Sequence, residues 1–541
     1  MIKKNDVINL KIDSCTAQGS GVGRHEGIAI FVPMTAPGDE ISAHILKVKP
    51  NYAFAKVNEI LTPSPDRIQV DCPAYAKCGG CVFRHLSYEA ETKIKADFVA
   101  DCLKRIGKTD ITPEPIIAAD SRQGYRNKAQ FPVAADADGI RMGFFASHSH
   151  RVTECRSCPL QPSEFEEILN AFEQYIRSCG VTVYDETAHR GLLRHIYLRR
   201  AHATGEIMVC AVINGNRLPE EERLVKILLA ANPDIKSICI NVNKEKTNVI
   251  LGKKCRTLYG PDYITDVLCS LEFRLSALSF YQVNAVQAQR LYGKAAELAR
   301  LTGRETVLDL YCGTGIIGLT MASKAKEIIG VEIIPEAIED AKINAKINNI
   351  NNARFICGDA SFAAKELQKE GLRPDVVILD PPRKGCSADV LETVAEMAPD
   401  RIVYISCDPA TQARDLTVLA PLGYTAEKAC PVDMFPATGH VETVVLLSQR
   451  RPDTHIDIKF DLSELDITSA ETKATYQEIK DYVLDKHGLK VSSLYISQVK
   501  AKCGIIEREN YNKGKEGHRV PQCPKEKEDA IMDALQHFKM I

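Results

Sequence analysis

A cysteine and a glutamate in the later part of the chain could carry out covalent chemistry together. Cys407 follows a short apolar run at 401–405 that is typical of a β-strand. Glu442 stands between a loop at 436–440 and a β-branched run. A thiolate is a strong nucleophile and a carboxylate can take or give a proton, so both could act on one substrate. Because most cysteines in apolar runs are small core residues, the pair needs support from the rest of the sequence.

The residues around this pair predict the ligand-binding edge of a parallel sheet. From residue 303 strands and helices alternate strictly, which is typical of a doubly wound α/β domain that binds ligands at the carboxyl ends of its strands. Four strands are expected before the one that leads to Cys407, at 305–310, 328–332, 353–357 and 375–379. The residues that follow or end these strands are Gly313 and Gly315, Glu332, Asp359, and Asp380.

These strand ends favour a ligand that contains a nucleoside. The glycine turn would let the backbone approach a ligand closely. Glu332 could accept both hydroxyls of a ribose, and Asp359 could meet an adenine amino group. NAD stays open as an alternative because Gly318 completes its glycine fingerprint, but an NAD enzyme predicts no cysteine after the fifth strand.

A second group of cysteines could bind a metal or a cluster. Cys72, Cys78 and Cys81 are spaced C-x5-C-x2-C around two glycines, and Cys155 or Cys158 could supply a fourth thiolate. Sites made only of thiolates suit zinc or an iron–sulfur cluster. The spacing by itself does not separate these two possibilities.

The first of four expected regions, residues 1–60, is predicted to be a small β domain. Short strands separated by glycine turns favour a closed barrel of the OB type. Four cations could line a nucleic-acid face on it, or could belong to an ordinary solvated surface: Arg24, Lys47, Lys49 and Lys56.

The other regions are a central α+β domain at 61–285, a Rossmann-like domain at 286–450 and an extension at 451–541. The central domain should contain a helix at 85–105, hairpins at 124–152, strands at 206–213 and 237–243, and a helix at 218–231.

The extension changes charge along its length. Residues 451–485 hold nine acids and four bases, whereas residues 486–541 hold eleven bases and seven acids. Two helices are expected, at 475–486 and 494–502, with a serine cap before the second. They suggest a helix-turn-helix reader of nucleic acid or a helical pair docked on the catalytic domain.

Composition limits the function classes. The 541 residues have a formal net charge of −2, so a nucleic-acid surface must be a local patch. No apolar run resembles a signal peptide or a membrane span, and nineteen scattered cysteines do not resemble a disulfide framework. We therefore expect a cytoplasmic protein with no membrane partner.

Five motifs in chain order resemble those of the RNA uracil-5-methyltransferases that use S-adenosylmethionine. The motifs are Phe280-Tyr281-Gln282-Val283-Asn284, Asp309-Leu310-Tyr311-Cys312-Gly313-Thr314-Gly315, Asp380-Pro381-Pro382-Arg383, Ser406-Cys407-Asp408-Pro409 and His440-Val441-Glu442-Thr443-Val444. The barrel is similar to the TRAM domain, and four cysteines look like that family's ligands to a [4Fe–4S] cluster: Cys72, Cys78, Cys81 and Cys158. Barrel and cluster together imply the branch that methylates 23S rRNA rather than the tRNA branch.

The resemblance also implies residue roles. Cys407 would be the nucleophile and Glu442 the base, acting on a uridine that is single-stranded or flipped out of its stack. The residues expected to contact the cofactor are Gln282, Tyr311, Glu332, Asp380 and Asp359. We expect a monomer. The alternatives are a tRNA uracil-5-methyltransferase and a non-catalytic RNA-binding iron–sulfur protein. A DNA cytosine-5 methyltransferase would carry its nucleophile after the fourth strand.

Overall fold

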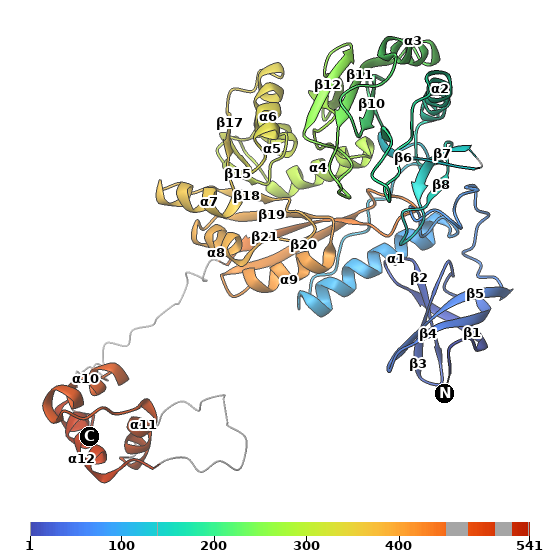
Figure 1. The fold of residues 1–541 in the computed structure, drawn as a ribbon. Helices are drawn as coiled ribbons and strands as arrows, with labels where there is room; N and C mark the ends of the chain where they lie inside the picture. Colours follow the sequence, from blue (N-terminus) through green and yellow to red (C-terminus); the bar gives the residue numbers. More distant parts are fainter. Residues whose placement is uncertain (1, 138, 451–473, 504–521, 539) are drawn as a thin grey trace. The chain divides into compact units, whose positions relative to one another are not determined.

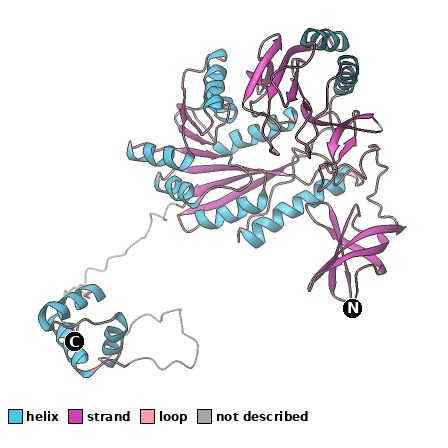
Figure 2. Cartoon of the chain, viewed as in Figure 1, coloured by secondary structure: helices cyan, strands magenta, loops and turns pink. Residues whose placement is uncertain are grey.

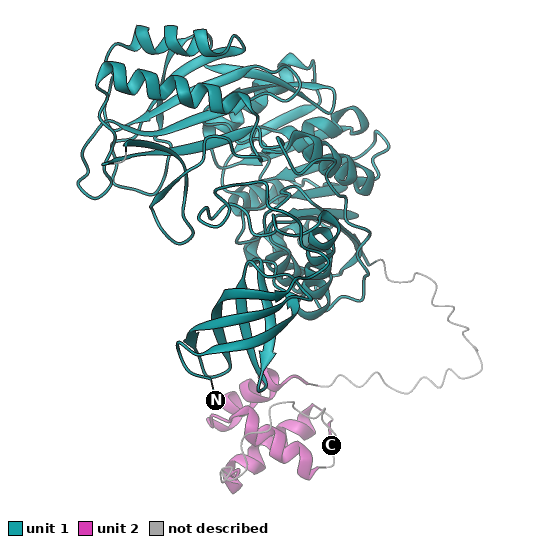
Figure 3. Cartoon of the chain, turned by 90° about the vertical axis from the view of Figure 1, so that its right-hand side faces the viewer, with its two compact units in different colours: residues 1–452 teal, residues 453–541 magenta. Residues whose placement is uncertain are grey.

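The computed structural model describes residues 2–137, 139–450, 474–503, 522–538 and 540–541. The chain forms two compact units, residues 1–452 and 453–541, which Figure 3 shows in different colours. None of the helices within these described ranges is both long and apolar enough to cross a membrane.

The amino-terminal strands close into a barrel, which confirms the prediction for this region. The strand order around it is β1-β2-β3-β5-β4. The strands are β1 Val7–Cys15, β2 Ser20–His25, β3 Ile28–Pro33, β4 Glu40–Val48 and β5 Tyr52–Thr62. Alternate residues such as Ile30, Val32 and Ile45 point inward and are fully buried, as the period of two requires.

Helix α1 (Tyr88–Asp101) connects the cysteine-rich segment to the rest of the first unit (Figure 1). The Ser87 side chain caps it by accepting a hydrogen bond from the Ala90 N–H. The helix continues as the π-helical turn η1 (Cys102–Ile106), so the predicted helix at 85–105 is present but starts three residues later. Its buried side chain Val99 and Leu103 of η1 join one buried core with Leu308, Leu379 and Tyr404 from the later part of the chain.

A seven-stranded sheet forms the middle of the first unit, in the order β12-β11-β10-β9-β6-β7-β8. Helices α2 (Glu164–Cys179) and α3 (Glu221–Ala231) share one buried core with it. Its strands are β6 Lys128–Asp136, β7 Gly139–Phe145, β8 Val152–Glu154, β9 Leu193–Arg200, β10 Ile207–Ile213, β11 Ile235–Val242 and β12 Lys254–Tyr259. A separate two-stranded sheet pairs β13 (Tyr263–Leu268) with β14 (Leu271–Ser276).

A second seven-stranded sheet carries the predicted catalytic pair and is called the catalytic sheet; its order is β17-β16-β15-β18-β19-β21-β20. Its first five strands are parallel, and β21 runs antiparallel between β19 and β20. The strands are β15 Thr306–Leu310, β16 Glu327–Glu332, β17 Ala353–Cys357, β18 Val376–Leu379, β19 Arg401–Ser406, β20 Tyr424–Val432 and β21 Glu442–Gln449. The predicted doubly wound fold is confirmed.

Helices cover both faces of this sheet (Figure 2). Two buried cores result, because successive residues of each strand point to opposite faces: Val307 and Ile378 join one core, Leu308 and Leu379 the other. The helices are α4 Ala285–Ala299, α5 Ile316–Met321, α6 Pro335–Ile347, α7 Ala360–Lys369, α8 Ala388–Glu396 and α9 Pro409–Leu419, with a 3₁₀ turn, η2, at Ala322–Lys324.

The second unit contains α10 (Tyr476–His487), α11 (Ser493–Lys502) and α12 (Lys525–His537). The first two confirm the predicted helices, and Ser492 caps α11. The prediction of two helices was incomplete, because α12 packs against both and shares their core through Ile531. Most of the acidic stretch at 451–485 lies outside the described residues.

Candidate active site

One cavity collects every catalytic and cofactor-binding residue that the sequence predicted. It has a volume of about 1440 Å³ and opens at the carboxyl ends of the catalytic sheet, against the motif before α4 and residues of the middle sheet. The predicted residues that line it are Gln282, Tyr311, Glu332, Asp359, Asp380, Cys407 and Glu442.

The antiparallel strand β21 brings the cysteine and the glutamate together. The pairing of β19 with β21 ends at the partners Ser406 and Thr443. Cys407 is the residue directly after Ser406, and Glu442 is the residue directly before Thr443. Cys407, directly after the end of β19, and Glu442, the first residue of β21, therefore lie at the same edge of the sheet.

The electrostatics of this pair are set mainly by burial. Burial first, and then the Glu442 carboxylate, raise the pKa of the Cys407 thiol, and the Arg383 guanidinium lowers it, so that the pKa lies at about 11. Glu442 is only 3% exposed, and burial raises its pKa to about 8. Burial likewise raises the pKa of Asp380 to about 7. At neutral pH, proton uptake by these carboxyls is therefore possible, as a general base requires.

The turn after β15 has the backbone conformation that glycine permits, as expected from the sequence. Gly313 and Gly315 have φ angles of +54° and +79°, values that residues with a β-carbon rarely adopt. Glu332 holds this turn, because its Oε2 accepts a hydrogen bond from the Gly313 N–H at 3.1 Å. Its Oε1 accepts from the Ile334 N–H at 3.0 Å, and the carboxylate still borders the cavity.

Asp359 caps a helix, a structural role that was not predicted from the sequence. It is the N-cap of α7, and its Oδ1 accepts hydrogen bonds from the N–H groups of Ser361 and Phe362. Asp359 also lines the cavity, so capping and ligand contact are compatible. The signal was present, since an aspartate directly before a helix is a common cap.

Two further charged residues, one beside the pair and one buried in β15, were not assigned a role from the sequence. Arg383 lines the cavity and its Nη2 lies 3.3 Å from Nε2 of His440. Asp309, on β15, is fully buried, and its Oδ2 accepts a hydrogen bond from the Gly318 N–H at 3.0 Å. Burial raises the pKa of Asp309 to about 8. An aspartate inside an apolar strand was the available signal, because unpaired carboxylates are rarely buried.

The cysteines of the amino-terminal half gather at a separate cavity of about 90 Å³. Five thiols line it together with Arg84 and Arg126: Cys72, Cys78, Cys81, Cys155 and Cys158. The donor set suits a thiolate-bound cluster in chemical type. In the described parts of the chain, however, no three or more His, Cys, Asp or Glu side chains are already arranged around one metal position.

The chain is similar to known RNA methyltransferases over most of its length. Residues 87–450 match the tRNA (uracil-5-)-methyltransferase family, and residues 3–57 match the TRAM domain. An uncharacterized RNA methyltransferase of Halalkalibacterium halodurans is 44% identical over 82% of this chain and 98% of its own length. One of Clostridium tetani is 43% identical over 83% of this chain and 97% of its own.

A solved structure agrees with these sequence matches. The Pyrococcus abyssi tRNA (uracil-54, C5)-methyltransferase in complex with S-adenosyl-L-homocysteine is 28% identical to this chain, with a TM-score of 0.67. The match covers 81% of this chain and 99% of that protein. With its barrel, its sheet order and its cavity, this chain belongs to the tRNA (uracil-5-)-methyltransferase family.

Proposed function

We propose that this protein transfers a methyl group from S-adenosylmethionine to C5 of a uridine in 23S rRNA. The observation that carries the proposal is that Cys407 and Glu442 lie at adjacent strand ends and line one cavity with the strand-end residues of a nucleoside site. Methylation at a ring carbon needs a nucleophile that activates the ring, a methyl donor and a base that removes the proton. A cavity that holds Cys407, Glu442 and a cofactor site could supply all three.

Residues of the cavity would hold the cofactor and the uracil. Glu332 would accept the ribose hydroxyls, and Gln282, Tyr311, Asp359 and Asp380 would border the rest of the molecule. When bound, S-adenosylmethionine supplies an electrophilic methyl group on a sulfonium.

Cys407 and Glu442 would act in sequence. The Cys407 thiolate adds to C6 of the uracil, which breaks the C5=C6 double bond and makes C5 nucleophilic. After C5 has gained the methyl group, the Glu442 carboxylate removes the C5 proton. The C5=C6 bond then forms again and the C6–sulfur bond breaks, which releases the thiolate and the methylated RNA.

The barrel and the cysteine cavity support ribosomal RNA as the substrate, through the resemblance to the rRNA branch. A tRNA substrate is the second candidate, because the solved relative from Pyrococcus abyssi is a tRNA methyltransferase. Mapping 5-methyluridine in the rRNA and tRNA of cells that lack the protein decides between them. Loss of the modification from tRNA alone would contradict our proposal.

We also propose that Cys72, Cys78, Cys81 and Cys158 hold a [4Fe–4S] cluster, because they border one cavity with no lysine, aspartate or glutamate in its lining. Anaerobically purified protein should then be brown and contain about four irons per chain. Cys78→Ser should bleach it, whereas Cys179→Ser, which changes a cysteine outside this cavity, should not. Stoichiometric zinc without iron would contradict the assignment.

We also propose that the protein acts as a monomer in a reducing compartment. None of the nineteen cysteines, all of which are described residues, forms a disulfide, which suits the cytoplasm. Both candidate catalytic residues come from the same sheet of one chain, so a single copy would suffice.

Replacing the two catalytic residues separately tests the chemistry. Cys407→Ala should bind RNA and cofactor yet form no covalent adduct, because nothing activates C5. Glu442→Gln should add to C6 and accept the methyl group but stall before elimination, since no group accepts the C5 proton. It should accumulate a methylated protein–RNA adduct that survives a denaturing gel.

Mass spectrometry of the digested adduct identifies the modified base. The Cys407→Ala, Glu442→Gln double variant is the control and should show no adduct. Methylation by Cys407→Ala would refute the proposed nucleophile, and turnover of Glu442→Gln at the wild-type rate would refute the proposed base.

A further inference from the structure

The loop at 433–441, which leads from β20 to Glu442, is held through five consecutive carbonyl oxygens. Each accepts a hydrogen bond from a group outside the loop, and the donors come from segments far apart in the sequence. In chain order of the carbonyls, the donors are Gln287 Nε2 at 2.9 Å, Asn284 Nδ2 at 3.1 Å, Lys95 Nζ at 3.1 Å, the Tyr125 hydroxyl at 2.9 Å, and the N–H groups of Val82 and Phe83 at 2.9 and 3.0 Å.

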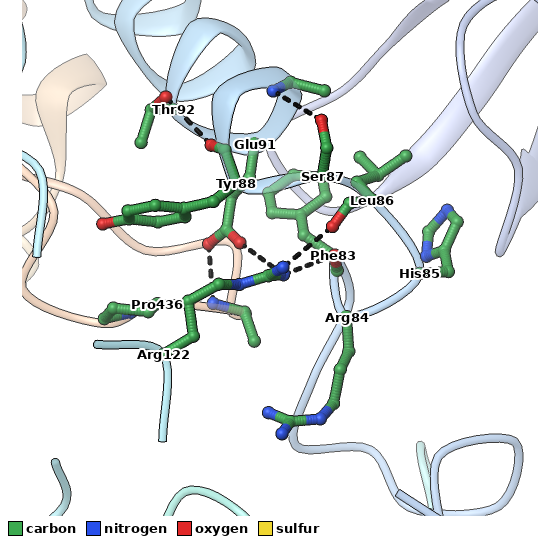
Figure 4. A network of polar contacts seen from close by, with 12 residues as sticks. Phe83, Arg84, His85, Leu86, Ser87, Tyr88, Glu91, Thr92, Arg122 and Pro436 are labelled. Carbon is green, nitrogen blue, oxygen red and sulfur yellow. Dashed lines mark hydrogen bonds and ion pairs between the residues drawn. The ribbon is translucent and has the colours of Figure 1, made fainter. Parts of the chain in front are cut away.

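Buried charges from α1 anchor the same loop. Lys95 Nζ donates to Oε1 of Glu91 and to Oδ1 of Asp433, each at 2.7 Å. Glu91 Oε1 also accepts from the Ala437 N–H at 2.6 Å, and Glu91 Oε2 accepts from Arg122 Nη2 at 2.8 Å. Figure 4 shows the Glu91 carboxylate between the Arg122 guanidinium and the backbone beside Pro436.

The four charges of this network balance one another. Lys95 is 1% exposed, and Glu91 and Asp433 are not exposed at all. Arg122 is nearly buried and also donates to the carbonyl oxygens of Phe83 and Leu86. Two carboxylates and two cations leave no net charge, which is the condition for burying such groups.

The loop backbone shows that outside contacts impose its shape. Ala437 is fully buried and has a φ of +68°, a left-handed value that a residue with a β-carbon adopts only when its surroundings dictate it. At Gly439 an added β-carbon would lie 2.3 Å from the carbonyl oxygen of Ala17 in the barrel, so the loop fits closely there as well.

We propose that these contacts position Glu442 for removal of the C5 proton, a role that rests on the proposed function. We name the groups the loop cradle: Glu91, Lys95, Arg122, Tyr125, Asn284 and Gln287. None of the six lines the active-site cavity, so in this role they act through the loop. Because catalysis falls steeply when a reacting group is displaced, the cradle controls the step that Glu442 performs.

Two variants test the cradle. Lys95→Met combined with Asp433→Asn removes one charge of each sign and so keeps the network neutral. Tyr125→Phe removes a single donor to the Pro436 carbonyl. Lys93→Met is the matched control, because Lys93 lies on the same helix with its side chain 78% exposed and, among the described residues, paired only with Asp97.

We expect amide hydrogens of the loop at 434–441 to exchange about tenfold faster in the double variant, while those of β19 stay unchanged. The kcat should fall by about a hundredfold with the KM for RNA unchanged. The methylated adduct should accumulate, as in Glu442→Gln, because addition and methyl transfer precede the affected step. Tyr125→Phe should show smaller changes in the same direction in amide exchange, kcat and adduct accumulation. Lys93→Met should match the wild type in all three.

The outcomes separate this inference from the proposed function. If Glu442→Gln traps the adduct but neither cradle variant does, the cradle has no role in proton removal and the inference fails alone. If Glu442→Gln traps nothing, both fail. If the double variant does not fold, Tyr125→Phe alone tests the inference. Loop amides that exchange at the wild-type rate, together with product release at the wild-type rate, would then overturn the inference.

Discussion

At Cys407, neighbouring charges act on the thiol in opposite directions. Burial and the Glu442 carboxylate raise its pKa, which reaches about 11, while Arg383 lowers it. With that value roughly one thiol in ten thousand is ionised at pH 7 in the free protein. Arg383, whose guanidinium lowers this pKa, is therefore the group that favours the nucleophilic form.

The reactivity of Cys407 should depend on pH. Alkylation of Cys407 by iodoacetamide should quicken as the pH rises from 7 to 10, because the thiolate is the reactive form. Arg383→Gln removes the stabilising cation, so the pKa of Cys407 should rise and its alkylation should slow by about tenfold at each pH. Peptide-resolved mass spectrometry separates Cys407 from the other cysteines.

Arg373→Gln is the control, since it removes the same charge from an exposed position outside the cavity lining. Glu442→Gln should act in the opposite sense. It should speed alkylation above pH 8, where the wild-type carboxylate with its pKa of about 8 is ionised. Equal rates for the wild type and Arg383→Gln would show that Arg383 does not govern the thiol.

The outer face of the barrel carries aromatic rings beside Lys47, one of the four predicted cations. Phe31, Tyr52 and Phe54 contact one another with ring centroids 5.5 to 5.9 Å apart. Tyr52 is 38% and Phe54 41% exposed. Lys47 pairs with Phe54 across β4 and β5, so its side chain lies on the same face. Aromatic rings beside cations favour contact with unstacked RNA bases over an ordinary solvated surface.

Two substitutions separate stacking from charge at this face. Phe54→Ala should cost about 1–3 kcal/mol of RNA binding and leave the salt dependence unchanged, because stacking releases no counterions. Lys47→Ala should lower the slope of log affinity against log salt by about one unit if it contacts a phosphate. Fluorescence anisotropy with an RNA fragment at several salt concentrations measures both.

Leu61→Ala serves as the control, because Leu61 is 47% exposed on the same strand and lies away from the ring cluster. Wild-type affinity for Phe54→Ala would mean that the rings do not stack on the RNA.

For the whole molecule, the boundary between the two units decides what can be removed. The catalytic sheet is complete at Gln449, and the first unit ends at Pro452. The second unit has a core of its own, which includes Ile479, Ile496 and Ile531. Its basic part at 486–541 carries eleven bases and seven acids.

We expect a protein truncated to residues 1–452 to unfold cooperatively and to form the methylated adduct when it carries Glu442→Gln. If the basic part contacts phosphates, truncation should weaken RNA binding and flatten its salt dependence. Binding isotherms of the full chain and the truncated chain, compared across salt concentrations, measure this. An unchanged slope would show that the second unit does not hold the RNA backbone.

The sequence by itself determined the features that depend on neighbours along the chain. The strands of the doubly wound sheet, the Ser492 cap and the capping Thr475 before α10 follow from local periodicity and local hydrogen bonds. The missed helix α12 was within reach, because its buried residues Ala530, Ile531, Ala534 and Leu535 recur at helical spacing. The seven cavity residues were named because each follows, ends or begins a strand, or lies in a motif.

Only the tertiary structure decided which of these residues meet. Insertion of β21 between β19 and β20 places Cys407 beside Glu442, and parallel pairing of β3 with β5 assembles the aromatic cluster. Lys95 and Asp433 pair across 338 positions of sequence. Such contacts depend on how apolar area and charge are buried over the whole unit, so no local pattern encodes them.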